Sequence, residues 1–319
     1  MLIQSLKGVL CAGNISWDIL VRPVNEFRWG TNTWVDEMIE DMGGNGSNTS
    51  YVLGRLGVPA RTLGMVGRDE RGDKLIAKLA GAGVDTAHIA RGQGPTTTTI
   101  CVVNSQANRL FMQRLGSSLE AFAEATVFEG GVVAGVSHYH QANLFSVPNL
   151  RRHSAAQMRR ARYAGLTTSL DTGWATDGRW METLETSLPL TDLLFVNEEE
   201  AHMITGRHDP AGIASTLRAH GATDIIVKLG ARGCVVFAGA EETAVEAFPV
   251  PIVDTTGAGD CFAGGFFAAL YRGYDYVRAA RYGNAAGALS VSRLGAVKGI
   301  AGWDEMERWI STHSSGARE

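Results

Sequence analysis

One short segment, residues 254–267, constrains the fold of this chain more than any other. The preceding residues 248–253 include two prolines, each of which disfavours helix in the residue before it, so this stretch is predicted to be extended. The following residues 261–271 are apolar and small, which predicts a buried helix. Gly257 and Gly259 allow the backbone to turn tightly, with consecutive N–H groups pointing outward at the start of that helix. Because first-turn N–H groups are unpaired and the helix dipole is positive there, this turn is a predicted anion site.

Asp260 stands in the first turn of the predicted helix, directly beside that anion site. A carboxylate at such a place fits a reaction in which a proton is removed next to a phosphate, as phosphoryl transfer to a hydroxyl requires. The simpler interpretation is a glycine-rich turn with an aspartate that caps the helix. A lone Gly-Ala-Gly-Asp would leave both interpretations open. Asp254 and two threonines precede it here, which makes the whole stretch much more specific.

This stretch resembles the C-terminal signature of the ribokinase-like (PfkB-type) carbohydrate kinases. The resemblance covers nearly the whole chain, because a second glycine-rich signature at residues 42–48 stands in the right order. In that family the aspartate matching Asp260 is the catalytic base, and the amides matching Gly257, Ala258 and Gly259 hold the transferring phosphate. The resemblance implies ATP-dependent, Mg²⁺-assisted phosphorylation of a hydroxyl on a sugar or a sugar-like alcohol.

The composition of the chain fits a cytoplasmic enzyme better than a nucleic-acid-binding or membrane protein. Its 319 residues, 45% of them hydrophobic, suit one large α/β domain. The net charge of −4 gives no basic footprint for nucleic acid, and no segment has the roughly 18 uninterrupted apolar residues of a membrane span. The cysteines are scattered in apolar runs without a CxxC pair, which predicts buried free thiols in a reducing cytosol: Cys11, Cys101, Cys234 and Cys261.

Strand-like and helix-like segments alternate along the chain, which predicts a three-layer α/β/α domain with a mostly parallel central sheet, ribokinase-like in the terms of the resemblance. We expect a single domain over residues 1–319, with buried strands at 9–12, 132–136 and 166–171 and a helix at 149–164.

Two further segments, residues 19–42 and 96–113, are β-prone and suit exposed strands outside the main sheet. The resemblance identifies them as a small β-strand lid that covers the acceptor and excludes water, which would compete for the phosphate. Because this lid often forms a dimer contact in the family, a homodimer through the lid is one expectation.

The acceptor side of the predicted site uses residues at the carboxyl ends of strands, where ligands gather in open α/β sheets. Asp18 alone is typical of a turn, but the family uses an aspartate here to bind acceptor hydroxyls. The glycines at residues 42–48 permit close approach of a ligand. Asn45 is less defined, because family members vary at that place. The resemblance assigns the acceptor to Asp18, Gly43, Gly44, Asn48 and Asn143.

His138 and His140 lie on the same side of a predicted strand. Two imidazoles so placed could bind zinc, but no third ligand is apparent. We therefore favour a strand-end position that lines the acceptor pocket. After Asp171 the chain lacks the asparagine and arginine that fructokinase-like and ketodeoxygluconate-kinase-like relatives often have, which disfavours those two substrates.

The nucleotide side begins at Asn197, which stands three residues before Glu200. This spacing is a capping box, which needs no metal. The family's N-x-x-E motif lies at the same place and organises Mg²⁺ and phosphates, largely through water, so both interpretations can hold together. Lys228 either neutralises a phosphate or is solvated at a strand end. The resemblance assigns ATP to Asn197, Lys228, Gly230, Gly233, Thr255 and Asn284.

A potassium site is a further hypothesis. Ribokinase-like enzymes bind K⁺ through mostly backbone oxygens, and backbone ligands leave little trace in a sequence. The matching positions here are Asp254, Ser290, Arg293 and Gly295.

Two rival functions stand beside the carbohydrate kinase. A nucleoside kinase on the same fold would need an aromatic clamp for the base of its acceptor. A non-catalytic sugar- or nucleotide-binding protein would not need Asp260 beside an intact Gly-Ala-Gly, which disfavours it. A dinucleotide-dependent oxidoreductase is disfavoured too, because no G-x-G-x-x-G follows the first strand.

Overall fold

A computed structural model describes residues 3, 6–106 and 108–313. The expected single domain over residues 1–319 includes positions outside these ranges, and its bounds stay a prediction. Ten strands of the described residues form one large sheet. These strands are β1 (Val9–Ala12), β4 (Ala60–Val66), β5 (Val84–Asp85), β6 (Ile89–Arg91), β9 (His138–Gln141), β10 (Thr167–Asp171), β11 (Leu193–Asn197), β12 (Asp224–Lys228), β13 (Cys234–Ala238) and β14 (Glu241–Val245).

The strand order of the large sheet is β14-β13-β12-β11-β10-β9-β1-β4-β5, with β6 also paired to β4. Every pair from β12 to β5 is parallel, whereas β13 and β14 extend the sheet as an antiparallel edge. Parallel strands end at the same edge of a sheet, so the polar residues that follow β1, β10, β11 and β12 lie near one another.

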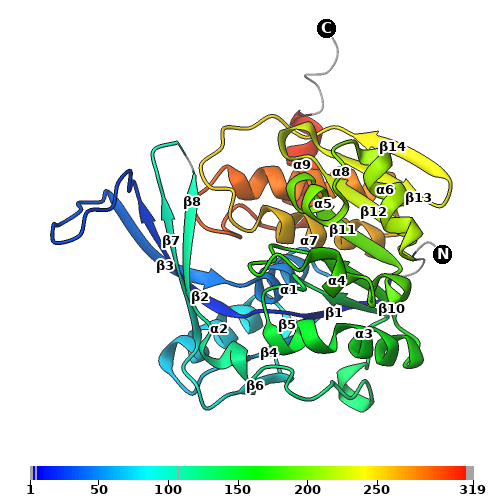
Figure 1. The fold of residues 1–319 in the computed structure, drawn as a ribbon, viewed down its shortest axis with the longest axis horizontal. Coiled ribbons are helices and arrows are strands. Elements are labelled where there is room, and N and C mark those ends of the chain that lie inside the picture. The colour runs from blue at the N-terminus through cyan, green and yellow to red at the C-terminus, as the bar shows by residue number, and fades with distance from the viewer. Residues whose placement is uncertain (1–2, 4–5, 107, 314–319) are drawn as a thin grey trace, which may run out of the picture.

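Helices cover both faces of this sheet (Figure 1). Side chains alternate along each strand, and in β1 this sends Val9 and Cys11 into one hydrophobic core and Leu10 and Ala12 into the other. The first core is closed by α1 (Asn45–Arg55), α2 (Glu70–Gly81), α7 (Ala258–Tyr271), α8 (Tyr276–Val291) and α9 (Trp303–His313). The second is closed by α3 (Pro148–Tyr163), α4 (Trp180–Leu184), α5 (Glu198–Thr205) and α6 (Pro210–Ala219).

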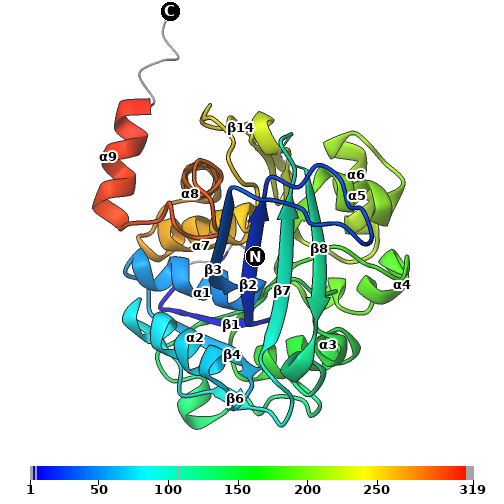
Figure 2. The ribbon, with the colours of Figure 1, turned by 90° about the vertical axis from the view of Figure 1, so that its left-hand side faces the viewer.

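A separate four-stranded sheet forms the lid, in the order β3-β2-β7-β8. Its strands are β2 (Ser16–Arg22), β3 (Glu37–Gly43), β7 (Thr97–Val103) and β8 (Arg109–Arg114). Figure 2 shows these strands side by side, in front of the helices of the main domain. The expected three-layer fold with a small lid is confirmed.

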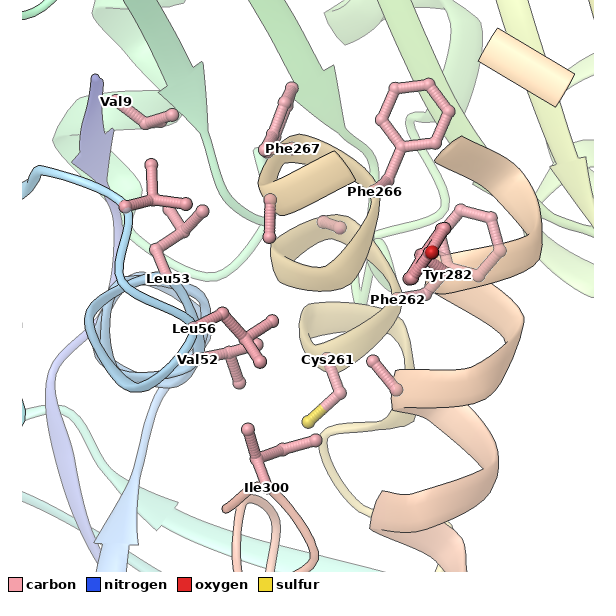
Figure 3. Packing of buried hydrophobic residues seen from close by; sticks show 14 of the residues in the cluster. Val9, Val52, Leu53, Leu56, Cys261, Phe262, Phe266, Phe267, Tyr282 and Ile300 are labelled. Carbon is pink, nitrogen blue, oxygen red and sulfur yellow. The ribbon is translucent and has the colours of Figure 1, made fainter. Parts of the chain in front are cut away.

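The helix α7 is buried on nearly all sides, which fixes the position of its first turn (Figure 3). Val52 and Leu53 of α1 lie on one side of it and Tyr282 of α8 on the other. Phe266 and Phe267 are fully buried, and both pack edge-on against Phe195 of β11. Such close packing leaves little freedom for the turn that precedes the helix.

The strand expected at residues 132–136 is wrong. A short 3₁₀ turn, Gly130–Val132, and a glycine with positive φ, Gly135, occupy this segment, which is half-buried to exposed. The strand is instead β9, with the sequence His-Tyr-His-Gln, and it is completely buried between β1 and β10. The sequence did not indicate this strand because its side chains are polar. Hydroxyl groups of the neighbouring strand contact both ring nitrogens of His138 and Nδ1 of His140, whereas Nε2 of His140 is buried without a hydrogen-bond partner among the described residues.

Candidate active site

The helix α7 begins at a turn that requires glycine. Gly257, the residue before the helix, has a φ of +73°, and a Cβ added there would lie 2.6 Å from the Cβ of Ala296. No side chain of the described residues caps the helix. The N–H groups of its first turn, including those of Ala258 and Gly259, are therefore not taken by a capping side chain, as an anion site requires.

Asp260 is the third residue of α7, and its side chain is almost completely buried. Each of its oxygens accepts a hydrogen bond from α1: Asn45 Nδ2 lies 2.9 Å from Oδ1, and Asn48 Nδ2 lies 2.8 Å from Oδ2. Burial raises the pKa of Asp260 to about 7, although both amide hydrogen bonds oppose this change. A carboxylate with a pKa near neutrality is suited to act as a general base.

The ammonium group of Lys228 lies beside the first turn of α7. Lys228 ends β12, and its Nζ donates a hydrogen bond of 2.8 Å to Oδ2 of Asp171, which ends β10. A Cβ added at Gly259 would lie 3.1 Å from this Nζ. Burial works against the charge, but the carboxylates of Asp171 and Glu200 outweigh it and raise the pKa of Lys228. A permanent cation therefore stands at the predicted anion site.

Asn197 and Glu200 form the capping box that their spacing predicts. Asn197 Oδ1 accepts from the Glu200 N–H at 2.8 Å, while Glu200 Oε2 lies 3.4 Å from the Asn197 N–H. The same oxygen of Glu200 accepts a hydrogen bond of 2.7 Å from the Thr172 hydroxyl. Burial, and then the neighbouring Asp171 carboxylate, raise the pKa of Glu200. The capping box thus holds a buried carboxylate at the edge of the sheet where Lys228 also lies.

The carboxylates of this region suit a magnesium ion that keeps most of its water. Among the described residues, no three His, Cys, Asp or Glu side chains converge to hold a metal ion. Magnesium usually takes one or two carboxylates together with water and phosphate oxygens, instead of a complete protein cage. Glu200, with Asp171 close enough to affect its pKa, supplies that kind of donor set.

On the lid, Asp18 of β2 faces the second glycine-rich segment. Its side chain is 6% exposed, and Ser16 donates a hydrogen bond of 2.7 Å to its Oδ1. A Cβ added at Gly43 would collide with the Asp18 carboxylate, and Gly44 has a φ of +91°. Glycine at position 43 therefore makes room for the Asp18 carboxylate, and glycine at position 44 permits the turn into α1. Burial raises the pKa of Asp18 to about 6.

The two asparagines predicted to bind the acceptor use their N–H₂ groups within the protein. Asn48 donates to Asp260, and Asn143 donates to Oδ1 of Asn45 at 3.0 Å. The carbonyl oxygens of Asn48 and Asn143 are buried and have no hydrogen-bond partner among the described residues. These two oxygens therefore have unused capacity to accept hydrogen bonds.

The remaining residues assigned to ATP occupy turns and a helix near the same sheet edge. Gly230 and Gly233, with φ of +59° and +86°, bound the turn between β12 and β13. Thr255 lies in the turn before Gly257 and accepts from the Ala258 N–H at 3.4 Å. Asn284 of α8 donates from Nδ2 to the carbonyls of Val245 and Glu246, both at 3.0 Å. Asn284 therefore anchors the end of β14, and its contact with a nucleotide stays a prediction.

The structure brings together two of the residues assigned to potassium. Asp254 Oδ1 accepts from the Thr256 N–H at 2.9 Å, and its Oδ2 accepts from the Gly295 N–H at 3.0 Å. Ser290 lies close by, since its hydroxyl donates to the Ala296 carbonyl at 2.8 Å. Arg293 is exposed. Both carboxylate oxygens of Asp254 thus bind backbone N–H groups, one of them in the turn before α7.

The expected position of His138 and His140 lining the acceptor pocket is wrong. His138 begins β9 and His140 is its third residue, and both rings are completely buried against Phe267. Ser169 lies between them, 2.7 Å from His138 Nε2 and 2.8 Å from His140 Nδ1. Burial lowers the pKa of both imidazoles, that of His140 to about 3. They are neutral residues of the core and do not line the acceptor side.

Sequence reasoning gave no site role to Asp171 or Thr172 and left Asn45 undefined. Asp171 pairs with the cation, Thr172 holds Glu200, and Asn45 contacts the predicted base. The position of Asp171 and Thr172 directly at the end of a buried strand was the available signal. Asn45 offered no such signal, because its contact depends on how α1 packs against α7.

A model of the pfkB family of carbohydrate kinases matches residues 9–301. The 2-dehydro-3-deoxygluconokinase of Bacillus subtilis is 27% identical over 288 residues, which cover 87% of this chain and 89% of that protein. The ribokinase of Haemophilus influenzae is 29% identical over 265 residues, which cover 81% of this chain and 83% of that protein.

Among solved structures, a candidate ribokinase II from Escherichia coli, in complex with ATP and Mg²⁺, has a TM-score of 0.82 and 25% identity. The alignment covers 97% of this chain and all of that one (100%). The chain therefore belongs to the pfkB family of carbohydrate kinases, and the expected enzyme class is confirmed. Within the described part of the chain, every helix is too short or too polar to span a membrane.

Proposed function

We propose that this chain transfers the terminal phosphate of ATP to a hydroxyl group of a neutral sugar or sugar-like alcohol, with Asp260 as the general base. The observation that carries the proposal is the position of Asp260. This buried carboxylate, with its pKa raised to about 7, stands in the first turn of a helix whose N-terminal amides no side chain caps. Proton removal and phosphate binding are thereby brought together at one helix end.

In the proposed reaction Asp260 accepts the proton of the acceptor hydroxyl as the oxygen attacks phosphorus. The amides of Gly257, Ala258 and Gly259 and the Lys228 ammonium stabilise the charge on the transferring phosphoryl group. When bound, Mg²⁺ would neutralise charge on the phosphate oxygens, and Glu200 would hold it through water. Asp171 orients Lys228 toward the helix.

The acceptor is expected among Asp18, Asn48 and Asn143. Their free groups are a carboxylate and two amide oxygens, all of which accept hydrogen bonds. An acceptor with several hydroxyl donors and no negative charge matches this set, whereas a sugar acid would place its carboxylate beside hydrogen-bond acceptors. A nucleoside kinase, the second candidate, shares the chemistry and differs in the acceptor.

Three other expectations belong to the proposal. A homodimer through the lid is supported by exposed apolar side chains on its edge strands, such as Met38, Leu110 and Met112. Residence in the cytoplasm is supported by the four cysteines, all of which are free and buried. The potassium site rests on the positions of Asp254, Ser290, Arg293 and Gly295 and needs a direct measurement of K⁺ dependence.

The test is a screen of ATP consumption with Mg²⁺, with and without K⁺, over ribose, fructose, 2-keto-3-deoxygluconate, common hexoses, inositols and nucleosides. The Asp260→Asn variant serves as the blank for each acceptor. Turnover of a neutral sugar or polyol that disappears in the variant supports the proposal. A nucleoside preference would favour the second candidate, and absence of ATP and ADP binding would refute the kinase assignment.

A further inference from the structure

Two asparagines, Asn143 and Asn45, are linked to the predicted base by successive hydrogen bonds. Asn143 Nδ2 donates a hydrogen bond of 3.0 Å to Asn45 Oδ1, and Asn45 Nδ2 donates one of 2.9 Å to Asp260 Oδ1. The three residues belong to different parts of the fold: Asn143 follows β9, Asn45 is the first residue of α1, and Asp260 lies in α7. Acceptor binding alone does not explain this connection.

Asn143, the first residue of this hydrogen-bonded series, has a fixed position. Asn143 has a φ of +57°, an unusual conformation that asparagine tolerates better than most residues. The next two residues donate backbone hydrogen bonds to the end of β10, from Leu144 to the Asp171 carbonyl at 2.9 Å and from Phe145 to the Thr172 carbonyl at 3.4 Å. Any side chain at position 173 would collide with the amide of Asn143. Asn143 is thus fixed to the strand that also carries Asp171.

This arrangement determines which end of the Asn45 amide faces the base. Because Oδ1 of Asn45 accepts from Asn143, its Nδ2 must point toward Asp260. The opposite orientation would set a carbonyl oxygen against a carboxylate. Asn48 supplies a second N–H donor to the other carboxylate oxygen. Two neutral amide groups, one for each oxygen, therefore fix the orientation of the carboxylate. Hydrogen bonds to the charged form of an acid favour that form.

We propose that Asn45, held by Asn143, is a positioning residue that orients the Asp260 carboxylate toward the acceptor hydroxyl and stabilises its charged form. The proposal rests on the proposed function, in which Asp260 is the base. Asn45 would not contact the transferring phosphate, and its effect passes through Asp260.

The proposal is tested with Asn45→Ala, Asn45→Asp and Asn143→Ala. Loss of the Asn45 donor should move the acid limb of the kcat–pH profile upward by about one pH unit, since a hydrogen bond to a charged group is lost. Asn45→Asp also adds a like charge and should move it by about two units. Asn143→Ala should shift it less, in the same direction. The KM for ATP should stay unchanged in all three variants.

Asn149→Ala is the matched control. Its side-chain Nδ2 donates to the carbonyls of Leu119 and Ala121, and these hydrogen bonds include neither Asn45 nor Asp260. Loss of these structural hydrogen bonds should lower Tm without moving the pH profile. An unchanged acid limb in both Asn45 variants would overturn the proposal.

An infrared pH titration gives a readout that needs no acceptor. The carboxyl band of Asp260 is identified as the band that Asp260→Asn lacks, and its midpoint should rise in the order wild type, Asn143→Ala, Asn45→Ala, Asn45→Asp. The same midpoint in all four proteins would contradict the proposal that Asn143 and Asn45 act on Asp260. If the wild type phosphorylated no acceptor, the proposed function would fail, and this titration would still decide the proposal about Asn45.

Discussion

The two halves of the candidate site differ in the charge that they present. The nucleotide half contains a buried cation, Lys228, together with the uncapped first-turn amides of α7. The acceptor half contains the carboxylate of Asp18 and the side-chain oxygens of Asn48 and Asn143, and its assigned residues include no lysine or arginine. A phosphoryl group carries negative charge and needs the first set, whereas a neutral hydroxyl compound needs the second.

The boundary between the two halves is Asp260, which belongs to both. Its backbone lies in the helix of the predicted anion site, and its carboxylate accepts hydrogen bonds from Asn45 and Asn48 of α1, on the predicted acceptor side. The groups that donate hydrogen bonds to this carboxylate are neutral amides. A cation hydrogen-bonded to it would lower its pKa far more. The structure thus keeps Lys228 paired with Asp171 and leaves Asp260 able to take up a proton.

The largest expected effect comes from Asp260→Asn, which removes the group shared by both halves. Turnover should fall by about 10³- to 10⁴-fold, because general-base catalysis is lost while the shape of the side chain is kept. Isothermal titration should show that ATP still binds. Turnover close to that of the wild type would exclude Asp260 as the base.

The stability of this variant provides its control. A folded-state pKa of about 7 lies above the usual value for aspartate, so the folded protein loses stability as pH rises from about 4 to about 7. Asparagine removes this loss. Asparagine also loses one hydrogen bond, because its N–H₂ group faces the Nδ2 of Asn45 or Asn48. The Tm of Asp260→Asn relative to that of the wild type should therefore rise between pH 5 and pH 8, and a variant that shows no cooperative unfolding transition would point to damage of the fold as the cause of inactivity.

Lys228→Met tests the nucleotide half alone. Methionine keeps most of the length and removes the charge, so kcat/KM for ATP should fall by about 10²- to 10³-fold. The KM for the acceptor should change little. Lys74→Met is the matched control, because Lys74 is a half-exposed surface residue paired with Glu70. If Lys228→Met impaired binding of the acceptor as strongly as that of ATP, the division of the site into two halves would be contradicted.

The sequence predicted the fold and the α7 turn well because both depend on local patterns. Glycines with positive φ and an apolar helix constrain the turn, and the alternation of strands and helices predicts the layers. Gly43 was predicted to permit close approach of a ligand, and this stays a prediction, since the neighbour that requires glycine at this position is the carboxylate of Asp18. The capping box of Asn197 and Glu200 follows from spacing alone and was equally accessible.

What the sequence did not reveal depends on contacts between distant elements. Asp171 meets Lys228 across 57 positions, and Asn45 meets Asp260 across 215. No local pattern encodes such pairs. His138 and His140 led to the opposite error. Exposed, these side chains would indicate a ligand site, but both are buried beside Thr167 and Ser169 of the neighbouring strand, which contact both ring nitrogens of His138 and Nδ1 of His140. A polar buried strand is hard to predict because its partners lie elsewhere in the chain.

Asp18→Asn tests the acceptor half alone. An amide is a weaker acceptor than a carboxylate, so the KM for the acceptor should rise by about 10- to 100-fold, as expected when a hydrogen bond to a charged group is weakened. The KM for ATP should stay within about twofold. Asp36→Asn, at an exposed position of the same lid, should leave both constants unchanged. A change in the KM for ATP that matched the change for the acceptor would contradict the assignment.

The pH dependence of the wild type separates the two halves without a mutation. Because the pKa of Asp260 is raised to about 7, kcat should fall about tenfold for each pH unit below that value. The acceptor kcat/KM should fall more steeply below pH 6, because Asp18, whose pKa is raised to about 6, also becomes protonated. Asp18→Asn should remove this additional dependence and leave the kcat profile in place. Initial rates between pH 5 and 9 measure the pH profiles of kcat and of the acceptor kcat/KM. A kcat independent of pH across neutrality would show that proton removal by Asp260 does not limit the reaction.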